Sequence, residues 1–281
     1  MEAFERPERA RVQAPCILRM GSMTPSIRTV AVTQSDPFFT GRFFETFLPT
    51  AREKGVEVVE IALLPNFNES RPALVRRLAS LYGPAGLIRL VGRYAGARLD
   101  ERRGRPRGVE AVATANGVAL RPLATINDPS YLATLRERSV DVLLSVAAPQ
   151  IFGSEALAAT PLALNVHNGR LPDYRGMMPT FWALLYGEER VVVTVHEMAE
   201  RLDAGAVLAE FDVPVAPGDS AFDVARNAKA VAGREVAGLL ATARAEHWPA
   251  PRAIDVGRGR YHGFPTRTDA RRLRERGRRM L

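Results

Sequence analysis

The chain has 281 residues, of which 46% are hydrophobic and 25% charged, a balance that is ordinary for a globular protein with one large α/β domain or two small ones. Its formal net charge of +8 is carried almost entirely by arginine, because Lys54 and Lys229 are the only lysines, and we attribute it to coding bias in preference to nucleic-acid binding. The single cysteine, Cys16, excludes an internal disulfide framework and a cysteine-based zinc site. There is no apolar run of membrane-spanning length and no signal peptide, so we expect a reducing, cytoplasmic location.

Strand patterns alternate with helix patterns from the run IRTVAVTQ (27–34) onward. The run VDVLLSVAA (140–148) is apolar throughout, as expected for a strand buried on both faces. The segment 220–245 has the clearest helical periodicity. In chain order, the expected strands span residues 27–34, 56–64, 118–125, 140–148, 161–167, 190–198 and 206–215. The expected helices span residues 36–55, 71–98, 109–117, 128–139, 154–160, 180–189 and 220–245.

Several residues mark the expected ends of these helices. The helix over 71–98 is interrupted at YGPAG, and the polar, glycine- and proline-containing stretch 99–108 is expected to be a linker. Asp128 before a proline is a helix-capping signal, and Ser154 and Thr180 are the expected caps of the next two helices.

Alternating strands and helices predict a Rossmann-like α/β fold, a doubly wound and mostly parallel sheet, with a C-terminal helical tail. In such sheets ligands bind at the carboxyl ends of the strands, where Asn165 and His167 lie. No G-x-G-x-x-G follows the first strand, and neither a P-loop nor a G-x-S-x-G elbow is present. A dinucleotide or nucleoside triphosphate site is therefore not supported.

We divide the chain into three parts on composition. Residues 1–25 are charged and aperiodic, which predicts a poorly ordered tail, and either Met1 or Met23 could be the true start. Residues 26–250 form the expected catalytic domain, and residues 251–281 form a basic C-terminal tail.

The basic tail contains a short expected helix in FPTRTDARRLRERG. Thr266 or Thr268 would cap it and Gly277 would end it. We expect this helix to dock on the domain and not to contact RNA, because it has too few aromatic residues for base stacking. His247 and His262 are expected to be surface residues.

Three side chains could carry chemistry at the strand ends. His167 can hold or donate a proton near neutral pH, and Asn165, two residues away on the same strand face, offers an uncharged donor for an oxyanion. Asp203 lies in the loop AERLDAG, where Ala204 and Gly205 allow close backbone approach. The trio suits acyl-type transfer to an amine. On spacing alone, a turn asparagine, a structural histidine and a turn aspartate stay open as the alternative.

Two segments carry a family resemblance. NVHNGRLPDYRGMMPTFWALLYGE, followed by VTVHEMAERLDAGAVLAEFDVPV, resembles the formyltransferases that use 10-formyltetrahydrofolate. That family includes methionyl-tRNA, glycinamide ribonucleotide and sugar-nucleotide formyltransferases and formyltetrahydrofolate deformylase. Its pattern is Asn-x-His, a small turn, Leu-Pro-x-Tyr/Phe-Arg/Lys-Gly, a histidine-bearing strand and a Leu/Val-Asp-x-Gly loop, all of which occur here in order. The resemblance is strong over 140–216 and weaker over 27–135.

The resemblance implies a catalytic triad of Asn165, His167 and Asp203, with 10-formyltetrahydrofolate as co-substrate and no metal. A substrate amine would attack the formyl carbon while Asn165 and His167 stabilise the oxyanion. Asp203 would help the proton leave the amine, directly or through water, and would bias His167 toward its charged form. His196 falls on the family's second-strand histidine, and we expect it to be a buried residue behind the site.

The resemblance also implies where the folate lies. It would rest against the backbone of 148–152 and against the loop 198–203, whose donors and acceptors suit a pterin edge. The residues expected in this pocket are Gln150, Ile151, Met198 and Leu202.

The sequence departs from the family pattern at three places that concern the acceptor. Asn168-Gly169-Arg170 replaces the usual Pro-Ser-Leu, with Gly169 allowing unusual backbone angles and Arg170 adding charge at the pocket rim. The loop TQSDPFFTG lacks the glycine-rich phosphate cradle of the glycinamide ribonucleotide enzymes. The chain after residue 245 is too short for the extra β-barrel domain of methionyl-tRNA formyltransferases.

The expected partner is therefore a small-molecule amine, either an amino sugar or another biosynthetic amine. Hydrolysis of 10-formyltetrahydrofolate to formate is the alternative, although the regulatory domain usual at the start of deformylases is not found in residues 1–25. A methionyl-tRNA-type enzyme without its C-terminal domain is the second alternative, so tRNA is disfavoured but open as a partner. A non-enzymatic relic of the fold predicts a lost triad position, and none is lost. No membrane partner is expected, and a homodimer is left open.

Overall fold

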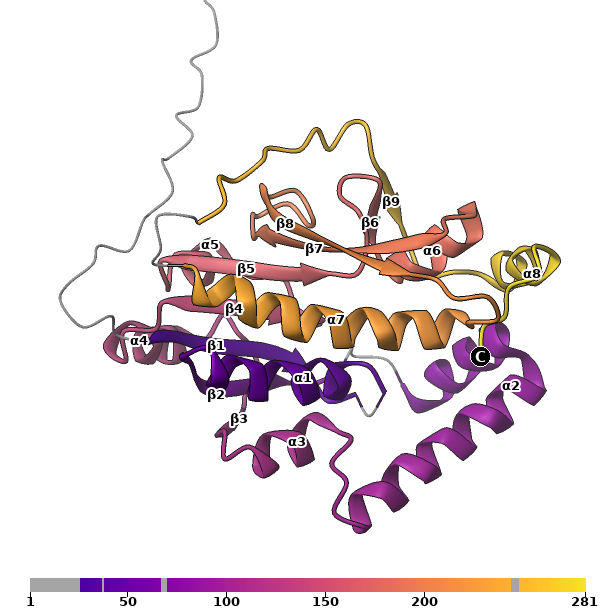
Figure 1. Ribbon diagram of the computed structural model, residues 1–281, viewed down its shortest axis with the longest axis horizontal. Coiled ribbons are helices and arrows are strands. Elements are labelled where there is room, and N and C mark those ends of the chain that lie inside the picture. Colours follow the sequence, from indigo (N-terminus) through magenta and orange to yellow (C-terminus); the bar gives the residue numbers. More distant parts are fainter. Residues whose placement is uncertain (1–25, 37, 67–69, 244–247) are drawn as a thin grey trace, which may run out of the picture.

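The computed structural model describes residues 26–36, 38–66, 70–243 and 248–281, and it contains a seven-stranded sheet in the order β3-β2-β1-β4-β5-β7-β8 (Figure 1). Its strands are β1 (Ile27–Gln34), β2 (Val56–Leu64), β3 (Leu120–Pro122), β4 (Val142–Val146), β5 (Leu162–His167), β7 (Arg190–Glu197) and β8 (Val207–Pro214). The helices are α1 (Thr40–Glu53), α2 (Arg71–Arg102), α3 (Val109–Ala115), α4 (Pro129–Glu137), α5 (Ser154–Leu157), α6 (Pro179–Tyr186), α7 (Ala221–Ala241) and α8 (Arg267–Glu275).

The sheet confirms the predicted doubly wound α/β fold. Strands β3, β2, β1, β4 and β5 are parallel, and β7 and β8 continue the sheet in antiparallel pairs. β4 is buried at every position, as its uninterrupted apolar run predicted, because helices cover both faces. The core on one face contains the α1 phenylalanines and the inner side of α7, and the other contains residues of α4 and α5.

Some predicted boundaries were wrong. The first residues of the expected linker 99–108 are helical, because α2 extends to Arg102. The helix bends at Gly83, whose φ is 70°. The cap of α5 is Gly153, not Ser154, and the cap of α6 is the left-handed Met178, not Thr180. Neither Gly153 nor Met178 has a side chain that bonds the first turn, so the stronger hydroxyl signals of Ser154 and Thr180 were misleading, although Pro179 at the first position of α6 marked Met178. The predicted tail 1–25, including Cys16 and Met23, and His247 lie outside the described residues.

The C-terminal segment packs along the domain. Arg252 bridges to Val207, and the short strand β9 (Arg260–His262) pairs in parallel with β6 (Tyr174–Gly176), a two-stranded sheet that the sequence did not predict. α8 begins at a Thr266–Asp269 capping box and buries Ala270 and Leu273, which confirms the predicted docking of this helix.

His262 was wrongly expected to be a surface residue. The imidazole is buried and stacks on Trp182 with ring centroids 4.7 Å apart. The pairing of β9 with β6 places it against this side chain of α6. The assignment of 251–281 as a separate tail stays a prediction. No helix in the described part of the chain is long and apolar enough to cross a membrane.

Close packing of α1 on α7 predicts that Gly233→Ala destabilises the fold. An added Cβ would overlap Thr46 Oγ1 and the backbone carbonyl of Phe43, and overpacking of this kind costs about 1–3 kcal/mol. Gly238 on the same helix is the matched control, because its nearest neighbour, Lys54 Cε, is 3.9 Å away. Gly238→Ala should stabilise by about 0.5–1 kcal/mol through helix propensity. Urea unfolding of both variants is the measurement, and equal free energies of unfolding would contradict the packing argument.

Candidate active site

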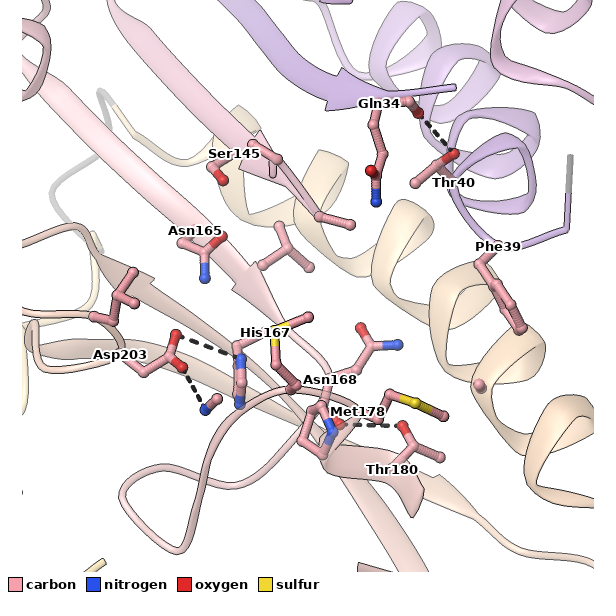
Figure 2. A pocket seen from close by; sticks show the side chains of 18 of the residues that line it. Gln34, Phe39, Thr40, Ser145, Asn165, His167, Asn168, Met178, Thr180 and Asp203 are labelled. Atoms are coloured by element: carbon pink, nitrogen blue, oxygen red, sulfur yellow. Dashed lines mark hydrogen bonds and ion pairs between the residues drawn. The ribbon is translucent and has the colours of Figure 1, made fainter. Parts of the chain in front are cut away.

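A cavity of about 380 Å³ opens at the carboxyl ends of β1, β4 and β5, between the loop after β7 and the first turns of α6 and α7. Figure 2 shows side chains from these elements facing one another across it. All of the side chains predicted to form the site line this one cavity. They are Asn165, His167, Asp203, Gln150, Ile151, Met198 and Leu202.

His167 ends β5 and is held at both ring nitrogens. Its Nε2 lies 2.6 Å from the backbone carbonyl oxygen of Tyr174, and its Nδ1 lies 3.5 Å from Oδ1 of Asp203 (Figure 2). The carbonyl can only accept a hydrogen bond, so Nε2 donates to it, while Nδ1 faces the Asp203 carboxylate at an ion-pair distance.

Asp203 is held by the backbone of β6 and lies in a loop that folds tightly against β7. Its Oδ2 accepts a 2.7 Å hydrogen bond from the N–H of Gly176, and its own φ is 50°, in the left-handed region. Two residues later the chain folds back on the end of β7, where any Cβ on Gly205 would overlap the carbonyl oxygen of Glu197. The close backbone approach predicted from Ala204-Gly205 is therefore present at Gly205.

His196 is buried on β7 beside Asn165, opposite it in the sheet register. Its Nδ1 lies 2.7 Å from the carbonyl oxygen of Glu197 and must donate, so Nε2 carries the lone pair and accepts from the Asn165 amide at 3.0 Å. Burial, followed by the charge of His167, lowers the pKa of His196 to about 4. His196, neutral near pH 7, thus orients the Asn165 amide so that its nitrogen faces His196, and the second N–H of that amide is left for a ligand.

The predicted folate residues form the other wall of the cavity. Gln150 links this wall to the preceding loop, since its side chain accepts a hydrogen bond from the N–H of Ile126 at 3.0 Å and donates one to the carbonyl of Ala124 at 2.9 Å. Both ends of its amide are therefore already bonded to the protein backbone. Ile151 and Leu202 are 60% and 46% exposed at the edge of the cavity, where two apolar side chains can cover a flat ring.

Asn168-Gly169-Arg170, which differs from the family pattern, does not play the role expected from the sequence. Gly169 does not have a positive φ; an added Cβ would overlap Pro179 and crowd Tyr174, so space and not backbone angle requires glycine. Arg170 does not line the cavity, and the predicted charge at the rim is absent from its described lining. Asn168 does line the cavity, and its backbone carbonyl oxygen accepts a hydrogen bond from the Thr180 hydroxyl.

The sequence did not reveal the far end of the cavity, which Phe39 and Thr40 mark in Figure 2. Asp36, Tyr82, Phe222 and Lys229 line this end, from the loop after β1 and from α2 and α7. These residues share no motif, and only the topology brings them together. The rarity of lysine in the chain was the one available signal for Lys229.

A doubly wound α/β protein with an imidazole, an oriented amide and a carboxylate in one cavity is of the acyl-transfer class, in which such groups stabilise an oxyanion and move a proton. The family model for formyl transferases matches residues 40–237, well over half of the chain. This protein therefore belongs to the formyl transferase family and is an enzyme of that class.

Solved structures with the same fold include a sugar N-formyltransferase from a Shewanella species, 19% identical with a TM-score of 0.53, covering 85% of this chain and 77% of that one. Glycinamide ribonucleotide transformylase 1 from Symbiobacterium toebii is 19% identical with a TM-score of 0.53 and covers 82% and 95%. An N-formyltransferase from Helicobacter canadensis, in complex with folinic acid and dTDP-3-aminofucose, is 14% identical with a TM-score of 0.52 and covers 85% and 71%. At these identities the likeness is one of fold.

The neutral state of His196 predicts a loss of stability in acid. Its pKa in the fold, about 4, lies below the ordinary 6.5, so the unfolded chain takes up the proton first. The contribution of neutral His196 is complete above pH 6.5 and is lost as the pH falls toward 4. Between pH 7.5 and 4.5, the wild type should lose about 2 kcal/mol more than His196→Gln. Urea unfolding at both pH values tests this, and an equal loss in the two proteins would refute it.

Proposed function

We propose that this enzyme transfers the formyl group of 10-formyltetrahydrofolate to a primary amine of a small-molecule acceptor, an amino sugar or another biosynthetic amine. The observation that carries the proposal is the convergence of two donors, Asn165 and His167, with one carboxylate, Asp203, at the strand ends of a formyl transferase fold. The folinic acid bound in the Helicobacter canadensis enzyme supports a formylated folate as the donor.

The proposed roles follow from the hydrogen-bond partners. As the amine attacks the formyl carbon, the carbonyl oxygen becomes an oxyanion, which the free N–H of Asn165 and the Nδ1–H of His167 stabilise. The 3.5 Å between Nδ1 and Asp203 is an ion-pair distance and not a close hydrogen bond, so the Nδ1 proton is available to the reacting oxygen. The Nε2 hydrogen bond to Tyr174 keeps the ring in place while this happens.

Asp203 is the proposed proton acceptor. Its Oδ2 is occupied by the N–H of Gly176, which leaves Oδ1, on the side of His167, to take the proton of the attacking amine directly or through water. Collapse of the tetrahedral intermediate breaks the bond to N10 of the folate, and that nitrogen leaves with the proton. The products are the formamide and tetrahydrofolate, so no external reductant or energy source is needed.

Hydrolysis would use the same groups with water in place of the amine. The triad geometry does not distinguish the two reactions, because both pass through an oxyanion at the formyl carbon. Amine dependence separates them: release of tetrahydrofolate at the same rate with and without every amine tested would identify a formate-releasing hydrolase.

Asp203→Asn is expected to reduce turnover at least about 10²-fold, because the amide cannot accept the amine proton and removes the counter-charge of His167. The assay is tetrahydrofolate release from 10-formyltetrahydrofolate in the presence of a panel of amines. The matched control is Asp212→Asn on β8, whose carboxylate pairs with Arg190 at an exposed position. Unchanged turnover in the Asp203 variant, or an equal loss in the control, would refute the proposed site.

A further inference from the structure

Lys229 is a buried cation without a partner at the far end of the cavity. It lies on the inner side of α7, is 7% exposed, and lines the cavity. No hydrogen bond or ion pair joins its ammonium group to any described residue. A buried charge is costly unless a counter-group satisfies it, and the cavity that Lys229 lines is where such a group could bind.

Asp36 is the nearest opposite charge, but it does not satisfy the lysine. Its Oδ1 accepts the N–H groups of Phe38 at 2.6 Å and Phe39 at 2.9 Å, at the beginning of α1, and it makes no ion pair with Lys229. Burial lowers the pKa of Lys229 to about 8, and the charge of Asp36 partly opposes this shift. The ammonium is therefore mostly charged at neutral pH, with its donors directed at whatever fills the cavity.

The surroundings select among anionic ligands. Of the 39 basic residues of the chain, only Lys229 lines the described cavity, so the paired guanidinium groups that grip phosphate are absent there. Asp36 lies just before α1, where its Oδ1 accepts the N–H groups of Phe38 and Phe39, so an anion at this end of the helix would meet a carboxyl group. Either anion would lie near Asp36, but one lysine balances the single charge of a carboxylate and leaves the second charge of a dianionic phosphate unbalanced.

The other walls at this end are mostly aromatic and apolar. Phe39, Tyr82, Phe222 and Met280 line the cavity together with the polar Gln34 and Thr40, and the triad lies toward the opposite end, where Figure 2 shows Asp203 and His167 across the cavity from Phe39. An acceptor that spans this distance would place an amine at the triad, an apolar body against the aromatic side chains, and an anionic group at the lysine.

We propose that Lys229 binds a carboxylate of the acceptor, so that the acceptor class is a small amino acid-like amine with an apolar body, and not a phosphorylated or nucleotide-linked amine. This inference rests on the proposed formyl transfer, because it assigns the acceptor of the same site.

Kinetics with matched amines test the assignment. The probes are ω-amino acids of increasing chain length, their neutral amides and their phosphonates. Lys229→Met should raise KM for the carboxylates about 10- to 100-fold, the effect of losing a hydrogen bond to a charged group, and should leave the neutral amides unchanged. Lys229→Arg should recover part of the loss. Lys54→Met, at the exposed end of α1, is the control and should match the wild type.

A second measurement does not depend on turnover. Because the chain has two lysines, [¹³C]lysine labelling gives two side-chain NMR signals, and Lys54→Met assigns them. The Lys229 signal should titrate near pH 8, move to a higher midpoint when a carboxylated amine binds, and move to a lower midpoint in Asp36→Asn. Phosphonates and neutral amides should move it less.

The two failures are distinguishable. If the Lys229 signal responds to carboxylates but no amine is formylated, the lysine site stands and the proposed reaction fails. If neutral or phosphorylated amines are formylated equally well by the wild type and Lys229→Met, and the Lys229 signal ignores carboxylates, the reaction stands and the acceptor assignment is overturned.

Discussion

The site depends on how the imidazole of His167 is held between two acceptors that the short strand β6 positions. The carbonyl of Tyr174, at the beginning of β6, accepts a hydrogen bond from Nε2 of His167. The N–H of Gly176, at the end of β6, donates to the Asp203 carboxylate, which faces Nδ1 of the same ring. One three-residue strand thus sets both neighbours of the histidine. Because β6 is itself paired with β9, the C-terminal segment supports the triad, and its Tyr261 and Met280 also line the cavity.

The two histidines of the site have different hydrogen-bond partners. His167 donates from Nε2 to a carbonyl and faces the Asp203 carboxylate with Nδ1, whereas His196 donates to one carbonyl and accepts from the Asn165 amide. Burial, followed by the charge of His167, lowers the pKa of His196, which favours the neutral form of its ring. The orientation of Asn165 is a consequence: its amide nitrogen faces the lone pair of His196, and its second hydrogen remains for a ligand.

Local pattern was enough to predict most of the fold and the residues that converge at the strand ends. Period-2 and period-3.6 patterns located the strands and the long helices, and the position of Asn165 and His167 at the end of a parallel strand placed them at the ligand edge. The β6–β9 pair could not be predicted, because residues 174–176 and 260–262 are too short to have a period and lie far apart in sequence. Asp36 and Lys229 were missed for the same reason, since their proximity exists only in the folded chain.

The two ends of the cavity are built from different elements, so the residues of the triad are separate from the residues proposed to bind the acceptor. The triad is built on β5, β7 and their following loops, where hydrogen bonds to backbone leave little freedom for substitution. The far end is built from side chains of the loop after β1 and of α1, α2 and α7, and α1 and α7 pack on the sheet through other residues of their surfaces. A helix can exchange one cavity-facing side chain without moving a strand, because that side chain is not part of the helix–sheet contact. Position 229 is such a place: a lysine there changes what the cavity can bind while the oxyanion donors stay fixed.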